Sequence, residues 1–158
     1  MVTERRAKLI ESLARTPTRV AELLESLPDR DTTRKPSADA FSARELVHHL
    51  RDIETHGWAP RLARILSETD PALPGVDGAR LAKEGHYNAR AHAPAFDELT
   101  RLRGEAVARL EKLDDESWNR NGRLEGVGMV DLEGLLDRWL AHDTEHLAEL
   151  EALCRPGG

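Results

Sequence analysis

Four long stretches of this chain carry apolar residues at every third or fourth position, which is the spacing of one face of an α-helix. This pattern constrains the fold more than any other feature, because each amphipathic helix must bury its apolar stripe against another element. Strand-like runs of β-branched and aromatic residues are absent from the sequence. The expected helices cover residues 3–27, 42–66, 94–113 and 131–153.

Two of these helices have recognisable starts. Ser42 and Glu45 form the S-x-x-E capping box, and Phe41 and Leu46 are spaced to make the hydrophobic staple around it. Asp131 is the expected N-cap of the last helix. These signals fix where the second and fourth helices begin, and therefore which side chains share a face.

Prolines and long connections divide the helices. Pro17 predicts a kink or a short break near Thr16, and Pro60 is a position at which the second helix can bend. The connection over residues 67–94 is unusually long, which predicts either that the helices it joins are parallel neighbours or that it covers something. We therefore expect an all-α four-helix bundle with one long crossover loop, formed by residues 1–158 as a single domain.

Composition excludes several classes of function. The net charge of -6 and the lack of a basic block disfavour a nucleic-acid partner. No apolar run approaches the length of a membrane span, and the N-terminal segment lacks the apolar core of a signal peptide, so we expect a cytoplasmic protein. The single cysteine, Cys154, excludes an internal disulfide and a multi-cysteine zinc site.

The stretch "HHLRDIETH" in the second helix raises the question of which histidine faces inward. With Leu46 as the origin and a rotation of about 100° per residue, the apolar stripe spans about 340° to 40°. On this count His49 lies at about 300°, at the edge of the stripe, and His48 lies at about 200°, almost opposite. The period therefore selects His49 as inward-facing and predicts that His48 faces outward. Asp52 lies one turn from His49, on its flank.

The fourth helix carries two further inward histidines. His142 and His146 lie one turn apart on its apolar face, a spacing at which two imidazoles can bind one ion. Asp143 points into the middle of the apolar stripe, where a carboxylate must be paired or hydrogen-bonded. The pair is not the H-E-x-x-H motif of zinc proteases. Three histidines with an open fourth position form the ligand set of a catalytic zinc site, and Asp52 and Asp143 are candidates for outer-shell partners.

The sequence resembles the DinB-like (YfiT-type) helical bundle family over nearly its whole length. Residues 41–66, "FSARELVHHLRDIETHGWAPRLARIL", look like the family's second helix, in which a serine-capped start leads to a His-Leu pair and an arginine-rich stretch. Residues 128–153 look like its fourth helix, whose hallmark is H-D-x-x-H-L. The resemblance implies that His49, His142 and His146 bind a divalent metal, zinc most readily and nickel as an alternative.

The resemblance also implies a class of reaction. Members with assigned chemistry are metal-dependent transferases that act with low-molecular-weight thiols, related isomerases, or hydrolases. We therefore expect a metal-dependent transferase that uses a low-molecular-weight thiol on a small-molecule substrate. The alternatives are a metal-dependent hydrolase, a non-catalytic bundle in which the metal is structural, and an interaction protein or dimer without metal. A homodimer is the expected assembly, and Arg101 and Arg103 are expected on a solvated face or against an anionic substrate.

Overall fold

The computed structural model describes residues 2–156, and most of them are helical. The elements appear in the following order along the chain: α1 (Glu4–Glu25), a 3-10 turn (Asp29–Asp31), α2 (Ala43–Ile53), a π-helical segment (Glu54–Trp58), α3 (Ala59–Ser67), β1 (Ala72–Leu73), α4 (Gly78–Gly85), a 3-10 turn (Tyr87–Ala89), α5 (Ala93–Leu110), α6 (Asp115–Trp118), β2 (Asn121–Leu124), β3 (Gly128–Asp131) and α7 (Leu132–Cys154).

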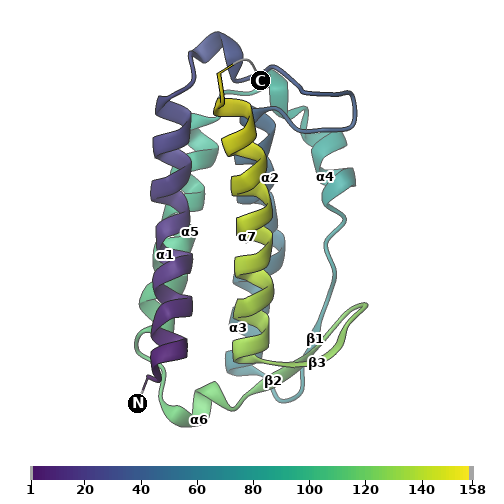
Figure 1. The fold of residues 1–158 in the computed structure, drawn as a ribbon. Coiled ribbons are helices and arrows are strands. Elements are labelled where there is room, and N and C mark those ends of the chain that lie inside the picture. The colour runs from purple at the N-terminus through teal and green to yellow at the C-terminus, as the bar shows by residue number, and fades with distance from the viewer. Residues whose placement is uncertain (1, 157–158) are drawn as a thin grey trace.

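The long helices form the predicted four-helix bundle (Figure 1). The first and last of them, α1 and α7, lie side by side and run in the same direction, while α2–α3 and α5 run the opposite way. Residues 68–92 form the long crossover, which returns from the lower end of the bundle to the upper end and carries β1 and α4. The length of this connection predicted either that it joins parallel neighbouring helices or that it covers something. Both are observed, because it joins two parallel helices and also lies against α2.

A small sheet at the lower end of the bundle was not predicted. Its strand order is β1-β2-β3, with β1 parallel to β2 and β2 antiparallel to β3. Each strand has at most four residues, and several of these residues are polar. The sequence therefore lacks the run of alternating apolar residues from which a strand is predicted. The sheet ties the start of the crossover to the hairpin before α7, and it buries Leu73, Leu124 and Val130.

The π-helical segment changes the phase of the second helix. The Ala59 amide donates to the carbonyl of Glu54, five residues back, so this turn holds one residue more than an α-helical turn. An uninterrupted helix would place Trp58, Leu62 and Ile65 about 100° to 160° from Leu46, outside the apolar stripe. The extra residue turns them back by about 100°. This rotation is consistent with their burial, since Trp58, Leu62 and Ile65 all lie in the core.

Helix α1 continues through Pro17, so the predicted break near Thr16 is absent. Proline has no amide hydrogen, which leaves the carbonyl of Leu13 without its usual helical donor. Nη1 of Arg103, on α5, donates to that carbonyl at 2.9 Å. A side chain from another helix therefore satisfies the group that the proline would leave unpaired.

The core of the helical bundle consists of two apolar clusters separated by a polar layer. The lower cluster includes Leu13, Ile53 and Trp139, and the upper cluster includes Val20, Leu46 and Leu150. Buried polar side chains lie between them on all four helices of the bundle: Thr16, His49, Glu54, Arg103, Asp143 and His146. The candidate site belongs to this layer.

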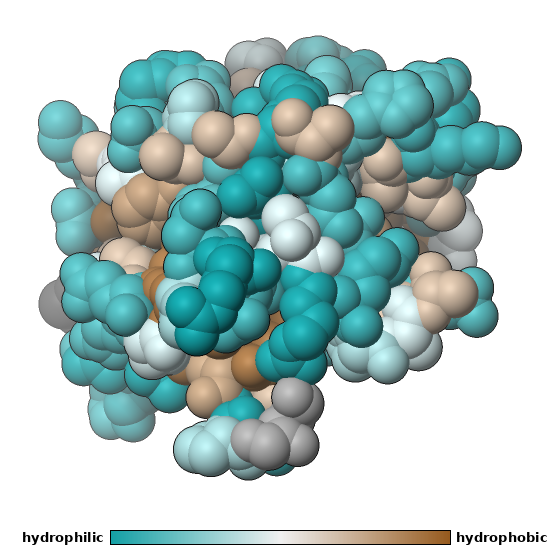
Figure 2. Space-filling view, turned by 90° about the horizontal axis from the view of Figure 1, so that it is seen from above, coloured by the Kyte–Doolittle hydropathy of each residue, from teal (hydrophilic) through white to brown (hydrophobic). Residues whose placement is uncertain are grey.

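The outer surface is largely polar. Seen from above, hydrophilic side chains cover most of the upper end of the bundle (Figure 2). Among the described residues, the large hydrophobic side chains that are exposed are Val127 and Met129, in and beside the β2–β3 turn. Across residues 2–156, no helix combines the length and apolar character that crossing a bilayer would need.

Candidate metal centre

Three histidines from two helices meet in the polar layer, as the sequence predicted. His49 comes from α2, and His142 and His146 lie one turn apart on α7. Their Nε2 atoms are mutually close: 3.3 Å between His49 and His142, 3.0 Å between His49 and His146, and 3.2 Å between His142 and His146. His49 and His146 are buried, and His142 is half-buried. Within residues 2–156 they form a group whose donor atoms could hold one metal ion.

The spacing of the three nitrogens fits a shared ion. Two imidazole nitrogens that bind zinc at about 2.0–2.1 Å with tetrahedral geometry lie about 3.3 Å apart, and octahedral geometry brings them to about 2.9 Å. The distances between the three Nε2 atoms fall in this range. Three converging ligands occupy one side of an ion and leave its other positions for a bound molecule.

Electrostatics also favours a cation between the rings. Burial, together with the neighbouring His146, lowers the pKa of His142 to about 3 and that of His49 to about 4. At neutral pH both rings are therefore uncharged, and each can offer a nitrogen lone pair to a metal.

The outer nitrogens of the triad depart from the usual pattern. A metal-binding histidine normally donates its second ring N–H to a carboxylate or a carbonyl. Here the Nδ1 atoms of His49, His142 and His146 form no hydrogen bond with a described residue. Nδ1 of His146 does lie 3.2 Å from a carboxylate oxygen of Glu149, although not in hydrogen-bonding geometry. Packing, and not outer-shell hydrogen bonds, orients the rings.

Aromatic rings and a glycine supply that packing. The ring of Phe41 lies 5.0 Å from that of His49, and the indole of Trp58 lies 5.9 Å from the ring of His142. Gly78, the first residue of α4, lies directly against His49, since a Cβ at this position would be 3.1 Å from Cε1 of the ring. The crossover thus forms one wall of the site and requires a very small residue there.

Asp52 and His48 anchor the far end of the crossover. Tyr87 donates its hydroxyl hydrogen to Asp52, and Arg51 forms an ion pair with the other carboxylate oxygen at 2.6 Å. Asp52 makes no hydrogen bond to the triad among the described residues. The prediction that His48 faces outward into solvent is wrong. Its ring is buried and stacks on Tyr87 at 5.2 Å, and its Nε2 lies 3.1 Å from the carbonyl oxygen of Arg90. The helical period predicts that His48 points away from the apolar stripe, and on that side of α2 the crossover residues Tyr87 and Arg90 cover the ring.

Asp143 belongs to a buried ionic cluster next to the triad. Arg103 donates two hydrogen bonds to Asp143, at 2.6 and 3.0 Å, and two to Glu54, at 2.7 and 2.9 Å. Thr16 also donates to Asp143, and Trp139 donates its indole hydrogen to Glu54. The expectation that Asp143 must be paired is confirmed. Among the described residues its hydrogen bonds go to Thr16 and Arg103, and none goes to a histidine of the triad.

Arg103 is buried, which corrects its expected place on a solvated face or against a substrate. Burial alone would lower its pKa, but Glu54 and Asp143 hold it above the usual value. The sequence did carry the signal, because Arg103 follows Leu99 by one helical turn and precedes Leu110 by two. Arg101 is exposed and pairs with Glu98 and Glu105 on its own helix.

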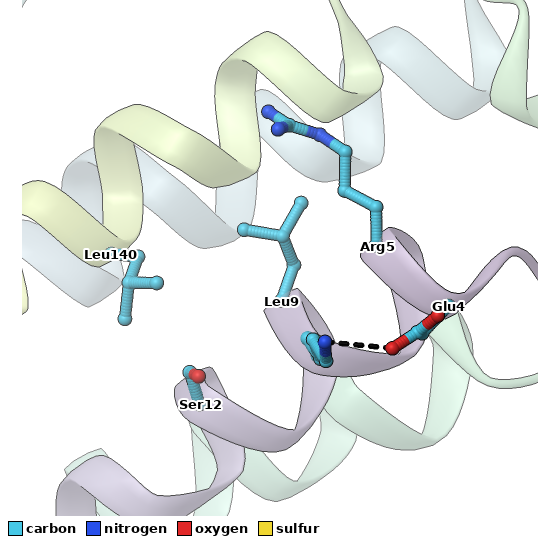
Figure 3. A pocket seen from close by; sticks show the side chains of 6 residues that line it. Glu4, Arg5, Leu9, Ser12 and Leu140 are labelled. Carbon is cyan, nitrogen blue, oxygen red and sulfur yellow. Dashed lines mark ion pairs between the residues drawn. The ribbon is translucent and has the colours of Figure 1, made fainter.

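Two surface grooves border the lower half of α7. One of about 470 Å³ lies between α1 and α7, where Leu9 and Leu140 form its apolar part and Lys8 pairs with Glu4 at its rim (Figure 3). The other, of about 600 Å³, lies between α7 and the β2–β3 hairpin. Ala141 lines this second groove and immediately precedes the half-buried His142, which is not itself among the lining residues.

Comparison with known proteins agrees with the fold. The chain is 23% identical over 156 residues to a protein of Bacillus subtilis (strain 168) named "Putative metal-dependent hydrolase YfiT", covering 98% of this chain and 87% of that one. The solved structure of YfiT, described as an unusual four-helix bundle topology, superposes with a TM-score of 0.87 at 22% identity, covering 97% of this chain and 87% of YfiT. A DinB-like protein of Bacillus subtilis, YjoA, gives a TM-score of 0.62 at 19% identity, covering 94% and 90%.

The sequence profile of the DinB superfamily matches residues 12–150, which include α2, α3 and α5, most of α1 and α7, and the three converging histidines. The match therefore spans most of the chain, and this chain belongs to the DinB superfamily.

Proposed function

We propose that His49, His142 and His146 hold one divalent metal ion, zinc in preference to nickel, in a cytoplasmic enzyme. The enzyme would transfer a low-molecular-weight thiol to an electrophilic small molecule. The convergence of three imidazoles on one point carries this proposal. A divalent ion held there would lower the pKa of a thiol or a water molecule bound beside it.

The surrounding residues support a thiol over water as the nucleophile. Glu54 and Asp143, the buried carboxylates of the polar layer, are both committed to Arg103, and Asp52 is held by Tyr87 and Arg51. None of the three is free to take a proton from a molecule in the site. A thiol has an ordinary pKa near 8.5, so it needs far less help to ionise than water does.

The second candidate is a metal-dependent hydrolase. The name of the relative YfiT favours it, and the same triad would serve it. The third is a bundle in which the metal only joins α2 to α7. The homodimer stays a prediction.

Metal analysis of untagged protein prepared without chelators tests the centre. Wild-type protein should carry one divalent ion per chain, and His142→Ala and His146→Ala should carry almost none. His56→Ala is the matched control, because His56 is exposed and lies seven residues beyond His49 on the same helical stretch. Wild-type protein without stoichiometric metal would refute the centre.

Activity assays on metal-loaded protein separate the reactions. Thiols combined with electrophiles form one panel, and esters with amides form the other. Turnover in the first panel that disappears in His142→Ala supports the transferase, whereas turnover only in the second supports the hydrolase. A loss of thermal stability in His142→Ala, with no turnover by wild type in either panel, would identify the metal as structural.

A further inference from the structure

Arg61, on α3, is a buried cation without an anionic partner. It is 8% exposed, and it forms no ion pair with any described residue. The other buried arginine on a core helix, Arg103, has two carboxylates against it. Burying an unpaired charge is unfavourable, and burial does lower the pKa of Arg61 from its usual value, only partly offset by the more distant Glu125. A buried guanidinium left in this state is suited to receive an anion from outside the chain.

The guanidinium lies close to the candidate metal centre. Its central carbon is 4.8 Å from the centre of the Trp58 ring, and the same ring lies 5.9 Å from that of His142. A single indole therefore separates Arg61 from the triad. The charge of Arg61 is also one of those that act on His142.

The π-helical segment explains how Arg61 reaches this position. On an uninterrupted helix, Arg61 would lie about 120° from His49 around the axis. The extra residue in the segment turns it back by about 100°, so that the two side chains project from nearly the same face. Segments of this kind are frequent at functional sites.

The hydrogen bonds of Arg61 leave one edge of the guanidinium free. Nε and Nη2 both donate to the carbonyl of Pro74 in the crossover, at 3.3 and 3.1 Å, which occupies one edge. Nη1 forms no hydrogen bond with a described residue and lies over Gly57, where a Cβ would be 3.5 Å from it. The Nη1–Nη2 edge therefore retains parallel N–H groups, the arrangement that binds both oxygens of a carboxylate.

We propose that Arg61 binds a carboxylate group of the small molecule whose other end occupies the metal centre. The proposal rests on the function proposed above and specifies its substrate class as thiols or electrophiles that carry a carboxylate. In this arrangement the crossover carbonyl of Pro74 orients the guanidinium, and Trp58 fixes its distance from the triad. The alternative role of Arg61 is to hold the crossover in place without touching a ligand.

A pair of probe thiols separates these roles. Protein loaded with Co²⁺ is titrated with 3-mercaptopropionate and with 3-mercapto-1-propanol, which differ only in the carboxylate. Binding is followed by the absorption band that a thiolate produces on cobalt. We expect wild-type protein to bind the carboxylate probe at least about tenfold more tightly.

The variants then assign that preference to one side chain. Arg61→Gln should lose the preference while its affinity for the neutral probe changes less than about threefold, and Arg61→Lys should keep only part of it because lysine lacks the two-pronged geometry. Arg64→Gln is the matched control, since Arg64 lies on the same helix, is only half-buried and pairs with Glu68. Metal content and melting temperature are recorded for each variant.

Equal affinity of wild-type protein for the two probes would overturn the proposal even if Arg61→Gln failed to fold. A preference that survives in Arg61→Gln would also overturn it. Absence of the cobalt band with both probes would instead refute the thiol-binding metal centre, and the role of Arg61 would fall with it.

Discussion

Replacement of Arg103 by Met tests how the polar layer contributes to stability. Arg103 makes five hydrogen bonds in the core, two to Glu54, two to Asp143 and one to the carbonyl of Leu13. Methionine keeps a side chain against Trp139, where the guanidinium lies 5.1 Å from the ring, but it supplies no donor and no charge. Two carboxylates and one carbonyl would then be buried without their partner.

The expected cost is large. Breaking a buried ion pair by removing one partner costs about 3–5 kcal/mol, because the remaining charge stays desolvated. The unpaired Leu13 carbonyl adds about 1 kcal/mol. We therefore expect Arg103→Met to lose about 4–6 kcal/mol of unfolding free energy at pH 7, a large fraction of the stability of a typical domain. Urea titration of metal-free protein, followed by tryptophan fluorescence and circular dichroism together, measures the loss.

The loss should shrink in acid. Burial raises the pKa of Glu54, and Arg103 counteracts that rise. Without Arg103 the pKa rises further, so Glu54 takes up its proton and becomes neutral at a higher pH. A carboxyl whose pKa is raised on folding favours the folded state at low pH, and it loses that contribution as the pH rises through the folded pKa. The difference between wild type and Arg103→Met should thus be smallest below about pH 5.

A matched control and a compensating variant complete the test. Arg101→Met removes an arginine from the same helix that also pairs with two carboxylates, but on the surface, and it should leave the urea midpoint nearly unchanged. Adding Glu54→Gln and Asp143→Asn to Arg103→Met should recover much of the loss. A loss below about 1 kcal/mol at pH 7, or one that does not change with pH, would refute the reasoning.

Two further predictions concern the triad and the crossover. The folded state lowers the pKa of His142 to about 3 and of His49 to about 4, so the unfolded chain binds protons first as the pH falls below about 6.5. The stability of metal-free protein should therefore be full above that pH and fall steadily towards pH 4 in urea titrations, and a flat profile would contradict the burial of the rings. Tyr87→Phe keeps the stack on His48 but removes the hydrogen bond to Asp52, with an expected cost of about 1–2 kcal/mol. Amides of the crossover should then exchange with solvent faster, and unchanged exchange would show that this bond does not anchor it.

The sequence was sufficient to place the three histidines. His49 lies only seven residues after a capping box that fixes the helix start, and His142 and His146 lie on a helix without interruption. In both cases the helical period alone gives the facing of the side chain. The crossover was identified by its length, although that length could not show that it would bury His48.

The parts that the sequence could not supply depend on contacts between distant segments. The position of Arg61 beside the triad could not be predicted from the sequence. A uniform rotation of 100° per residue ignores the extra residue of the π-helical segment and therefore places Arg61 on a different face from His49. The continuity of α1 through Pro17 depends on Arg103, which lies far along the chain. The partners of Asp143 come from two other helices, so the need for pairing could be predicted but not the residues that meet it.

The pairing of α1 with α7 has a consequence for how the protein is made. These two helices come from opposite ends of the sequence, yet they pack against each other and run in the same direction. During synthesis α1 leaves the ribosome first, and its apolar stripe then has no permanent neighbour on that side until α7 has emerged. Because α7 also carries His142 and His146, any ion that the three histidines hold can be captured only after α7 has emerged. Such an ion therefore could not assist the packing of the helices that emerge before α7.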